Sequence, residues 1–171
     1  MGRGNVAAAR VEAAELTDAE VRRALEHFAW CDAGARALIA GQTPPDPGDV
    51  SFVAARRGGW GVRRQGMTLD STYAPQAQAR EIIANEHFED AEAVVVFGCG
   101  GGSLPVALCE AVEDYKARVI VLEPDPAVLW GAFKREPALR LCSDERLCAF
   151  TSLQSLKMHL SRAGPTRGGC W

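Results

Sequence analysis

The sequence predicts an α/β protein, a Rossmann-like three-layer sandwich with a mostly parallel sheet, preceded by an N-terminal helix and a β-hairpin. Short apolar runs alternate with helical patterns over the second half of the chain, which is typical of a parallel sheet covered on both faces. A glycine-rich stretch also separates the first of these runs from the helical pattern that follows it, as in nucleotide-binding α/β folds.

The N-terminal region, residues 1–47, is expected to be a helical segment followed by a proline-rich linker. Thr17 and Glu20 have the spacing of a capping box, in which the two side chains accept hydrogen bonds from each other's backbone N–H groups. Apolar residues three and four apart follow, and they predict an amphipathic helix that extends towards Ile39. The linker is placed at residues 41–48, because the three prolines there cannot continue a helix.

Residues 48–70 are expected to form the β-hairpin. Gly58 and Gly59 lie between two runs of strand-forming residues, and paired glycines adopt the positive φ angles that tight hairpin turns need. Four arginines flank Trp60 in this segment, a composition compatible with a phosphate or nucleic-acid surface. Because the chain carries a formal net charge of −3, we favour instead a solvated edge strand protected by charge.

Residues 71–160 are expected to form the Rossmann-like domain. Its predicted helices begin at Pro75, Leu104, Pro126 and Leu153, and its predicted strands are 93–97, 119–123 and 146–150. In the first of these helices, Ala79, Ile82 and Ile83 form a stripe that is expected to be buried. Residues 161–171 have no pattern that would bury them, and we expect a disordered tail there.

The glycine loop after the strand at 93–97 is the candidate ligand site. Gly98, Gly100 and Gly102 have the spacing G-x-G-x-G, which lets the backbone turn sharply and a ligand approach it closely. Ser103 stands at the start of the next helix, whose N-terminus favours negatively charged groups. Glu123 occupies the strand end from which an acid binds ribose hydroxyls. A nucleotide-type ligand is therefore expected; the alternative is that the glycines serve only close packing.

The same spacing resembles motif I of the class I S-adenosylmethionine-dependent methyltransferases. Glu123 matches the acid that these enzymes place after their second strand. Two other acids of that family are missing, because Val96 precedes the loop and Thr151 follows the third strand. A positively charged methyl donor would therefore lack its usual counter-charges. Ser103 also replaces the third glycine of the dinucleotide fingerprint, which argues against NAD.

Four successive segments carry a second resemblance: LDSTYAPQAQAREI, VVVFGCGGGSL, VIVLEPDPAVLWGAF and LCSDERLCAF. In order and spacing they are similar to motifs of the motility-associated-factor (Maf) glycosyltransferases, which transfer nonulosonic acid sugars to serine and threonine of bacterial flagellin. The matched positions are Ser71, Tyr73, Pro75, Ala79, Gly98, Gly100, Glu123, Pro124 and Asp125. Ala74 and Gln78 depart from the family, which has aspartate and glutamate there.

This resemblance implies that the chain is the N-terminal accessory domain of such a glycosyltransferase, with no catalytic residue of its own. The family's central domain has no counterpart in the sequence, so we expect an isolated or truncated form. Its expected partners are flagellin or the missing catalytic domain, and a sheet edge or face left uncovered at the docking site would favour self-association. The alternative function is that of a small class I methyltransferase-like protein.

Composition argues against several other classes of protein. Six cysteines form no C-x-x-C pair and three histidines form no H-E-x-x-H, so no metal site is expected. The N-terminus lacks the apolar core of a signal peptide, and the longest uncharged stretch, 93–109, is too short to span a membrane. We therefore expect a cytoplasmic protein that binds neither membranes nor nucleic acid.

Overall fold

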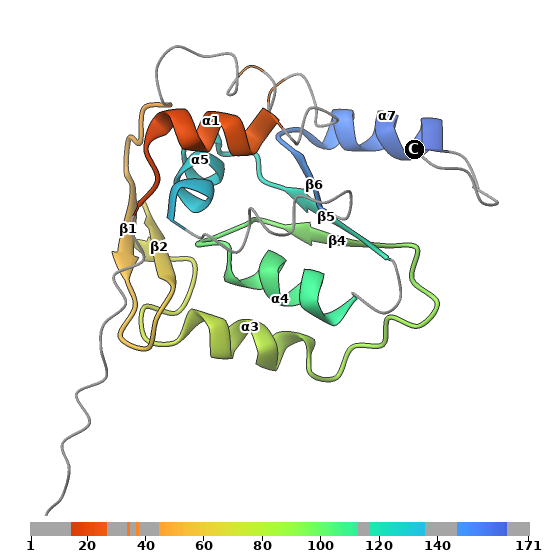
Figure 1. Ribbon diagram of the computed structural model, residues 1–171, viewed down its shortest axis with the longest axis horizontal. Coiled ribbons are helices and arrows are strands. Elements are labelled where there is room, and N and C mark those ends of the chain that lie inside the picture. The colour runs from red at the N-terminus through yellow and green to blue at the C-terminus, as the bar shows by residue number, and fades with distance from the viewer. Residues whose placement is uncertain are drawn as a thin grey trace, which may run out of the picture.

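A computed structural model of the chain describes residues 15–26, 34, 37, 45–112, 117–135 and 147–163. Within these residues the structure is mixed α/β and contains two sheets of three strands each. The first sheet is antiparallel and the second is parallel (Figure 1). The predicted α/β class, with a parallel sheet in the second half of the chain, is therefore confirmed.

Helix α1 spans Asp18–Glu26 and begins at the predicted capping box. The Thr17 N–H donates to Oε2 of Glu20 at 2.9 Å, and the Glu20 N–H donates to Oγ1 of Thr17 at 3.4 Å. These bonds satisfy backbone donors that a helix N-terminus otherwise leaves unpaired. Of the predicted continuation towards residue 39, only positions 34 and 37 are described, and both are helical.

The antiparallel sheet contains the predicted hairpin. Strand β1 (Val50–Ala54) pairs with β2 (Trp60–Arg64) around a turn in which Gly58 and Gly59 both have positive φ. A short third strand, β3 (Met67–Thr68), also pairs with β2, and the sequence pattern does not indicate it.

The hairpin is anchored on helix α5 (Pro126–Arg135), beside which it lies in Figure 1. Gly131 makes room for the ring of Phe52, because a Cβ at position 131 would overlap that ring. The Arg135 guanidinium lies 4.6 Å from the centre of the Phe52 ring and 5.5 Å from the centre of the Trp60 ring. These contacts hold the hairpin at one end of the parallel sheet.

The parallel sheet has the strand order β4–β5–β6. Its strands are β4 (Ala93–Phe97), β5 (Arg118–Leu122) and β6 (Leu147–Phe150), each within one residue of the predicted bounds. Strands β4 and β5 are parallel and pair along their whole length, so both end at the same edge of the sheet. Gly98 follows β4 and Glu123 follows β5, and both therefore lie at that edge. The fold therefore brings the predicted loop and the predicted acid together.

One face of the parallel sheet is covered by the helices that connect its strands, α4 (Ser103–Ala111) and α5. Leu108 of α4 and Phe133 of α5 join Val121 of β5 in the main hydrophobic core. Helix α3 (Pro75–Ile83) packs on the outer side of α4 (Figure 1). None of the described helices is both long and apolar enough to cross a membrane.

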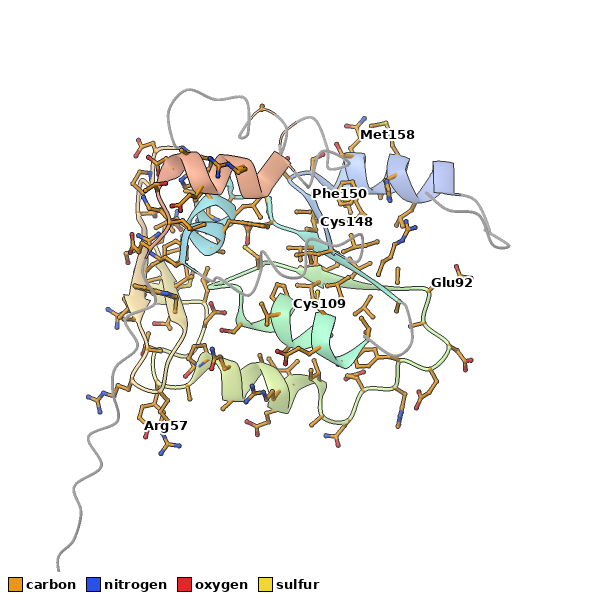
Figure 2. The ribbon with its side chains drawn as sticks, in the orientation of Figure 1. Arg57, Glu92, Cys109, Cys148, Phe150 and Met158 are labelled. Carbon is orange, nitrogen blue, oxygen red and sulfur yellow. The ribbon has the colours of Figure 1, made fainter. Side chains whose placement is uncertain are left out.

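The opposite face is covered by helix α7 (Leu153–Ala163), whose Leu156 packs with Ile120 and Phe150 in a second cluster. In Figure 2, Cys109 of the main core lies on α4, whereas Cys148 lies next to Phe150 of the second cluster. Helix α7 continues three residues beyond position 160, and residues 164–171 lie outside the described part of the chain.

Strand β4 leaves part of this second face open. Val95 and Phe97 point to it and are 39% and 74% exposed, whereas Val96 between them is buried. Their register partners on β5, Ile120 and Leu122, are buried. The expected incompletely covered sheet face is therefore present at β4, which is also an edge strand of the described sheet.

Candidate functional site

The glycine loop joins β4 to α4 at the carboxyl edge of the parallel sheet. Gly98, Gly100 and Gly102 have φ angles of 85°, 51° and 95°, which residues with side chains rarely adopt. The Gly98 N–H donates to the Leu122 carbonyl and the Gly102 N–H to the Cys99 carbonyl, both at 2.8 Å. The alternating glycines are thus explained by the tight backbone path of the loop.

Gly101 is explained by a close contact and not by its backbone conformation. A Cβ at this position would overlap the carbonyl oxygen of Trp60 on β2, so the missing side chain lets the loop lie directly against the hairpin. Close packing between the loop and the hairpin therefore explains the glycine at position 101 without a ligand.

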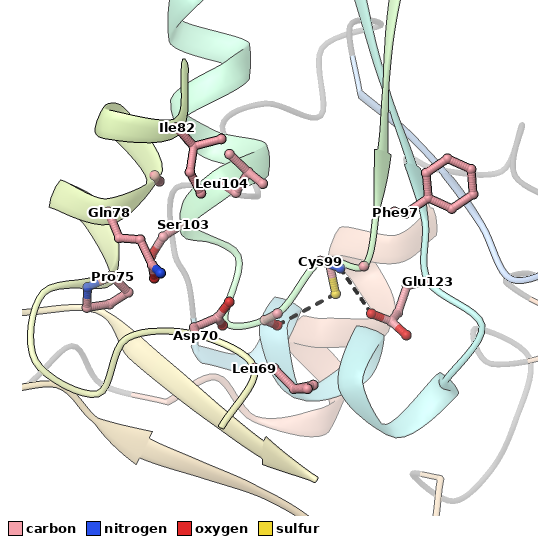
Figure 3. A pocket seen from close by; sticks show the side chains of 13 residues that line it. Leu69, Asp70, Pro75, Gln78, Ile82, Phe97, Cys99, Ser103, Leu104 and Glu123 are labelled. Carbon is pink, nitrogen blue, oxygen red and sulfur yellow. Dashed lines mark hydrogen bonds between the residues drawn. The ribbon is translucent and has the colours of Figure 1, made fainter. Parts of the chain in front are cut away.

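Asp70, which lies between the hairpin and α3, occupies the concave side of the loop (Figure 3). Its carboxylate accepts a hydrogen bond from the Gly101 N–H at 2.5 Å, and it lies so near Gly100 that a Cβ there would overlap it. Backbone N–H groups in such loops ordinarily bind an anionic ligand. Asp70 therefore takes the place that an anion would occupy.

The sequence patterns do not single out Asp70, because it is 31 positions before Gly101 and is not among the matched motif positions of its segment. One feature of the sequence could have indicated Asp70: it is the one acidic residue between Asp49 and Glu81. A lone carboxylate at the end of a basic hairpin is a candidate for a specific contact.

Glu123 lies on the other side of Cys99 from Asp70 (Figure 3). It is buried, its Oε2 accepts the Cys99 N–H at 3.0 Å, and its Oε1 accepts the Asp125 N–H at 2.9 Å. Asp125 in turn forms an ion pair with Arg64 of the hairpin at 3.2 Å. The structure thus places Glu123 beside the loop, where the strand spacing predicts it.

Burial and mutual repulsion act on the ionisable groups of the loop. Burial raises the pKa of the Asp70 carboxyl above its ordinary value; the Gly101 N–H opposes this rise and the charge of Glu123 adds to it. Burial, followed by the charges of Glu123 and Asp70, also raises the pKa of the Cys99 thiol well above its ordinary value. Cys99 is therefore a neutral thiol, which is a poor nucleophile.

The loop, α3 and α4 enclose a space of about 330 Å³, here called the glycine-loop cavity. Its side chains are Leu69, Asp70, Pro75, Gln78, Ala79, Ile82, Phe97, Cys99, Ser103, Leu104 and Glu123. This volume is at the lower end of the range for small-molecule sites. None of the described residues that line it is a lysine, arginine or histidine.

The predicted buried stripe on α3 is wrong at one position. Ala79 is buried against α4 as expected, and Ile83 packs at the edge of the main core. Ile82 is 54% exposed, because it lies on the cavity wall instead of the core.

Ser103 is the first residue of α4, and its side chain lines the same cavity. The residue is only 8% exposed, and its Oγ has no hydrogen-bond partner within the described part of the chain. Gly102, the N-cap of α4, provides no side-chain cap either. Among the described residues, the hydroxyl of Ser103 is thus left without a hydrogen-bond partner at the N-terminal end of α4.

The family-motif positions Ser71, Tyr73 and Pro75 form the turn that enters α3. Oγ of Ser71 accepts hydrogen bonds from the N–H groups of Tyr73 and Ala74 at 3.2 and 3.1 Å. Gln78 fixes the turn from the helix side, since its Oε1 accepts the Ser71 N–H at 2.9 Å. These residues position the segment that carries Asp70.

The hairpin arginines make local contacts. The Arg57 guanidinium lies 5.2 Å from the centre of the Tyr73 ring, and Arg64 forms the ion pair with Asp125. In the described part of the chain, no group of three or more potential metal ligands is present.

Comparison with protein-family models, curated proteins and solved structures finds no match to this chain. The resemblances described above therefore rest on the chain's own sequence alone.

Proposed function

We propose that the chain is an accessory, non-catalytic domain of a Maf-type flagellin glycosyltransferase, built on a Rossmann-like three-layer sandwich. Helices α4 and α5 on one face of the parallel sheet, with α7 on the other, support the fold assignment. The segments that carry the resemblance also meet in space, because α3 packs on α4 and Asp70, next to Ser71, fills the glycine loop. The contacts between these segments support the proposed family.

The observation that carries the accessory role is the negative charge of the glycine-loop cavity. Asp70 and Glu123 both accept hydrogen bonds from the loop, and no basic side chain is among the described residues that line the cavity. A nucleotide-activated nonulosonic acid carries phosphate and carboxylate groups, which two carboxylates would repel. Transfer from such a donor would then belong to another domain, while this one contacts flagellin or the catalytic domain.

Calorimetry with the full chain tests this role. We expect no heat of binding with a nucleoside monophosphate or with N-acetylneuraminic acid, and saturable binding of purified flagellin from the same bacterium. Binding of the two anionic probes in the glycine loop, without any binding of flagellin, would rule the accessory role out.

A second candidate is a class I methyltransferase-like protein, and the position of Asp70 favours it. S-adenosylmethionine carries a sulfonium and an ammonium group, and Asp70 provides a counter-charge that the sequence motifs lack. Glu123 stands at the strand end from which an acid binds ribose. Micromolar binding of S-adenosylhomocysteine, lost in a folded Gly100→Val variant, would favour this candidate over the accessory role.

A further inference from the structure

We propose that the glycine-loop cavity binds a primary ammonium group carried by a small molecule that has an apolar arm and no phosphate. The accessory role assigns no ligand to this cavity, so the inference goes beyond that role and does not depend on it.

The two carboxylates supply the charge that an ammonium group needs. Asp70 reaches the cavity from the segment before α3, and Glu123 reaches it from the end of β5, so two distant parts of the chain converge there. A carboxylate has about four lone-pair sites, whereas Asp70 accepts one backbone bond and Glu123 accepts two. Both therefore retain acceptor capacity, and an ammonium group has three donors and no acceptor.

The hydroxyl of Ser103 is an independent observation that points to a ligand. It belongs to a residue that is 8% exposed, it lines the same cavity, and within the described residues its Oγ has no hydrogen-bond partner. Buried hydroxyls in folded proteins are nearly always hydrogen-bonded, because an unsatisfied one destabilises the folded state. A donor on a bound ligand would give this oxygen its missing partner.

The apolar wall indicates the rest of the ligand. Ile82 lines the cavity but is 54% exposed, and Figure 3 shows it beside Leu104, which also lines the cavity. A hydrocarbon or aromatic arm lying on these side chains would remove their apolar surface from water. A phosphate would face the same two carboxylates that attract the amine, which excludes phosphorylated compounds.

Calorimetry of the full chain with n-hexylamine and hexan-1-ol tests the proposal, because the two probes share an arm and differ in charge. Near neutral pH we expect the amine to bind at least about tenfold more tightly than the alcohol. Asp70→Asn and Glu123→Gln should each lower the affinity for the amine about tenfold. Glu110→Gln removes an exposed carboxylate on α4 outside the cavity and should leave the affinity unchanged.

Ser103→Ala separates a ligand contact from a structural one. We expect it to weaken hexylamine binding severalfold without lowering Tm, whereas a purely structural hydroxyl would change Tm and leave the affinity intact. Equal affinities for amine and alcohol, or binding of neither, would overturn the proposal. Binding of S-adenosylmethionine without binding of hexylamine would overturn it in favour of the methyltransferase candidate. The amine and alcohol titrations do not test flagellin binding, so the proposed accessory role can fail independently.

Discussion

The carboxylate of Asp70 accepts a hydrogen bond from the backbone N–H of Gly101, so a side chain from outside the parallel-sheet region occupies the glycine loop. The same loop donates a second N–H, that of Cys99, to Glu123. Two backbone donors that a nucleotide-binding fold would offer to phosphate are thus bonded to the chain's own carboxylates. The two carboxylates make the glycine loop a negatively charged site.

Asp70→Asn should stabilise the protein at neutral pH. Because the pKa of Asp70 is raised in the folded state, its contribution to stability is greatest below the ordinary value of 3.8 and falls as pH rises from there to the raised folded pKa. Asparagine keeps an acceptor for the Gly101 N–H and removes the charge. We expect urea unfolding to give the variant a higher free energy of unfolding than the parent protein at pH 7, and a smaller dependence on pH.

Asp49→Asn is the control, because this carboxylate is exposed and does not line the glycine-loop cavity. If Asp70→Asn were less stable than the parent protein at pH 7, the ionised carboxylate of Asp70 would stabilise the folded state, which contradicts this prediction.

Gly131→Ala should destabilise the protein by about 1–3 kcal/mol, because the added Cβ would overlap the ring of Phe52. Helix propensity alone predicts the opposite sign, since alanine is favoured over glycine within a helix by about 1 kcal/mol. Urea unfolding decides between the two effects. The double variant with Phe52→Leu should recover much of the loss, and a Gly131→Ala variant more stable than the parent would show that the hairpin does not press on α5.

Phe97→Glu should reduce self-association of the chain. Strand β4 is an edge of the described sheet, and Phe97 is 74% exposed on its open face, so a second copy is the partner that we expect there. Sedimentation velocity should show concentration-dependent association of the parent protein that this variant lowers. Met67→Glu, at a residue 62% exposed on β3, should not change it. A parent protein that stays monomeric across the concentration range would refute this expectation.

Cys99 should resist alkylation in the folded protein. Burial raises the pKa of its thiol, and Glu123 and Asp70 raise it further, so the reactive thiolate is scarce at pH 8. Peptide mapping after treatment with iodoacetamide should show Cys99 modified more slowly than Cys148, which is only partly buried. Faster modification of Cys99 would mean that the loop opens readily.

The elements of this fold that could be predicted from the sequence are those with local signals. The β4 run ends at glycines, Thr17 and Glu20 form the predicted capping box, and Gly58 and Gly59 turn the hairpin. Such features depend on residues a few positions apart, and the sequence displays them directly.

The features that could not be predicted depend on how separate elements dock. Asp70 reaches Gly101 because the hairpin lies on α5 and on the glycine loop, and no periodicity encodes that contact. Ile82 has helical spacing like Ala79 and Ile83, but α4 covers Ala79 and leaves Ile82 on the cavity wall. Side chains with the same sequence signal therefore have different surroundings once the elements pack.

The backbone amide of Gly101 provides the most direct test of the charge of the loop. In ¹H–¹⁵N spectra of the full chain, titration with n-hexylamine should shift this amide saturably, because Asp70 accepts its hydrogen bond and would bind the ligand. Titration with a nucleoside monophosphate should leave it unshifted. A saturable shift with the phosphate and none with the amine would show that an anion displaces Asp70, and the account of a negatively charged site would be wrong.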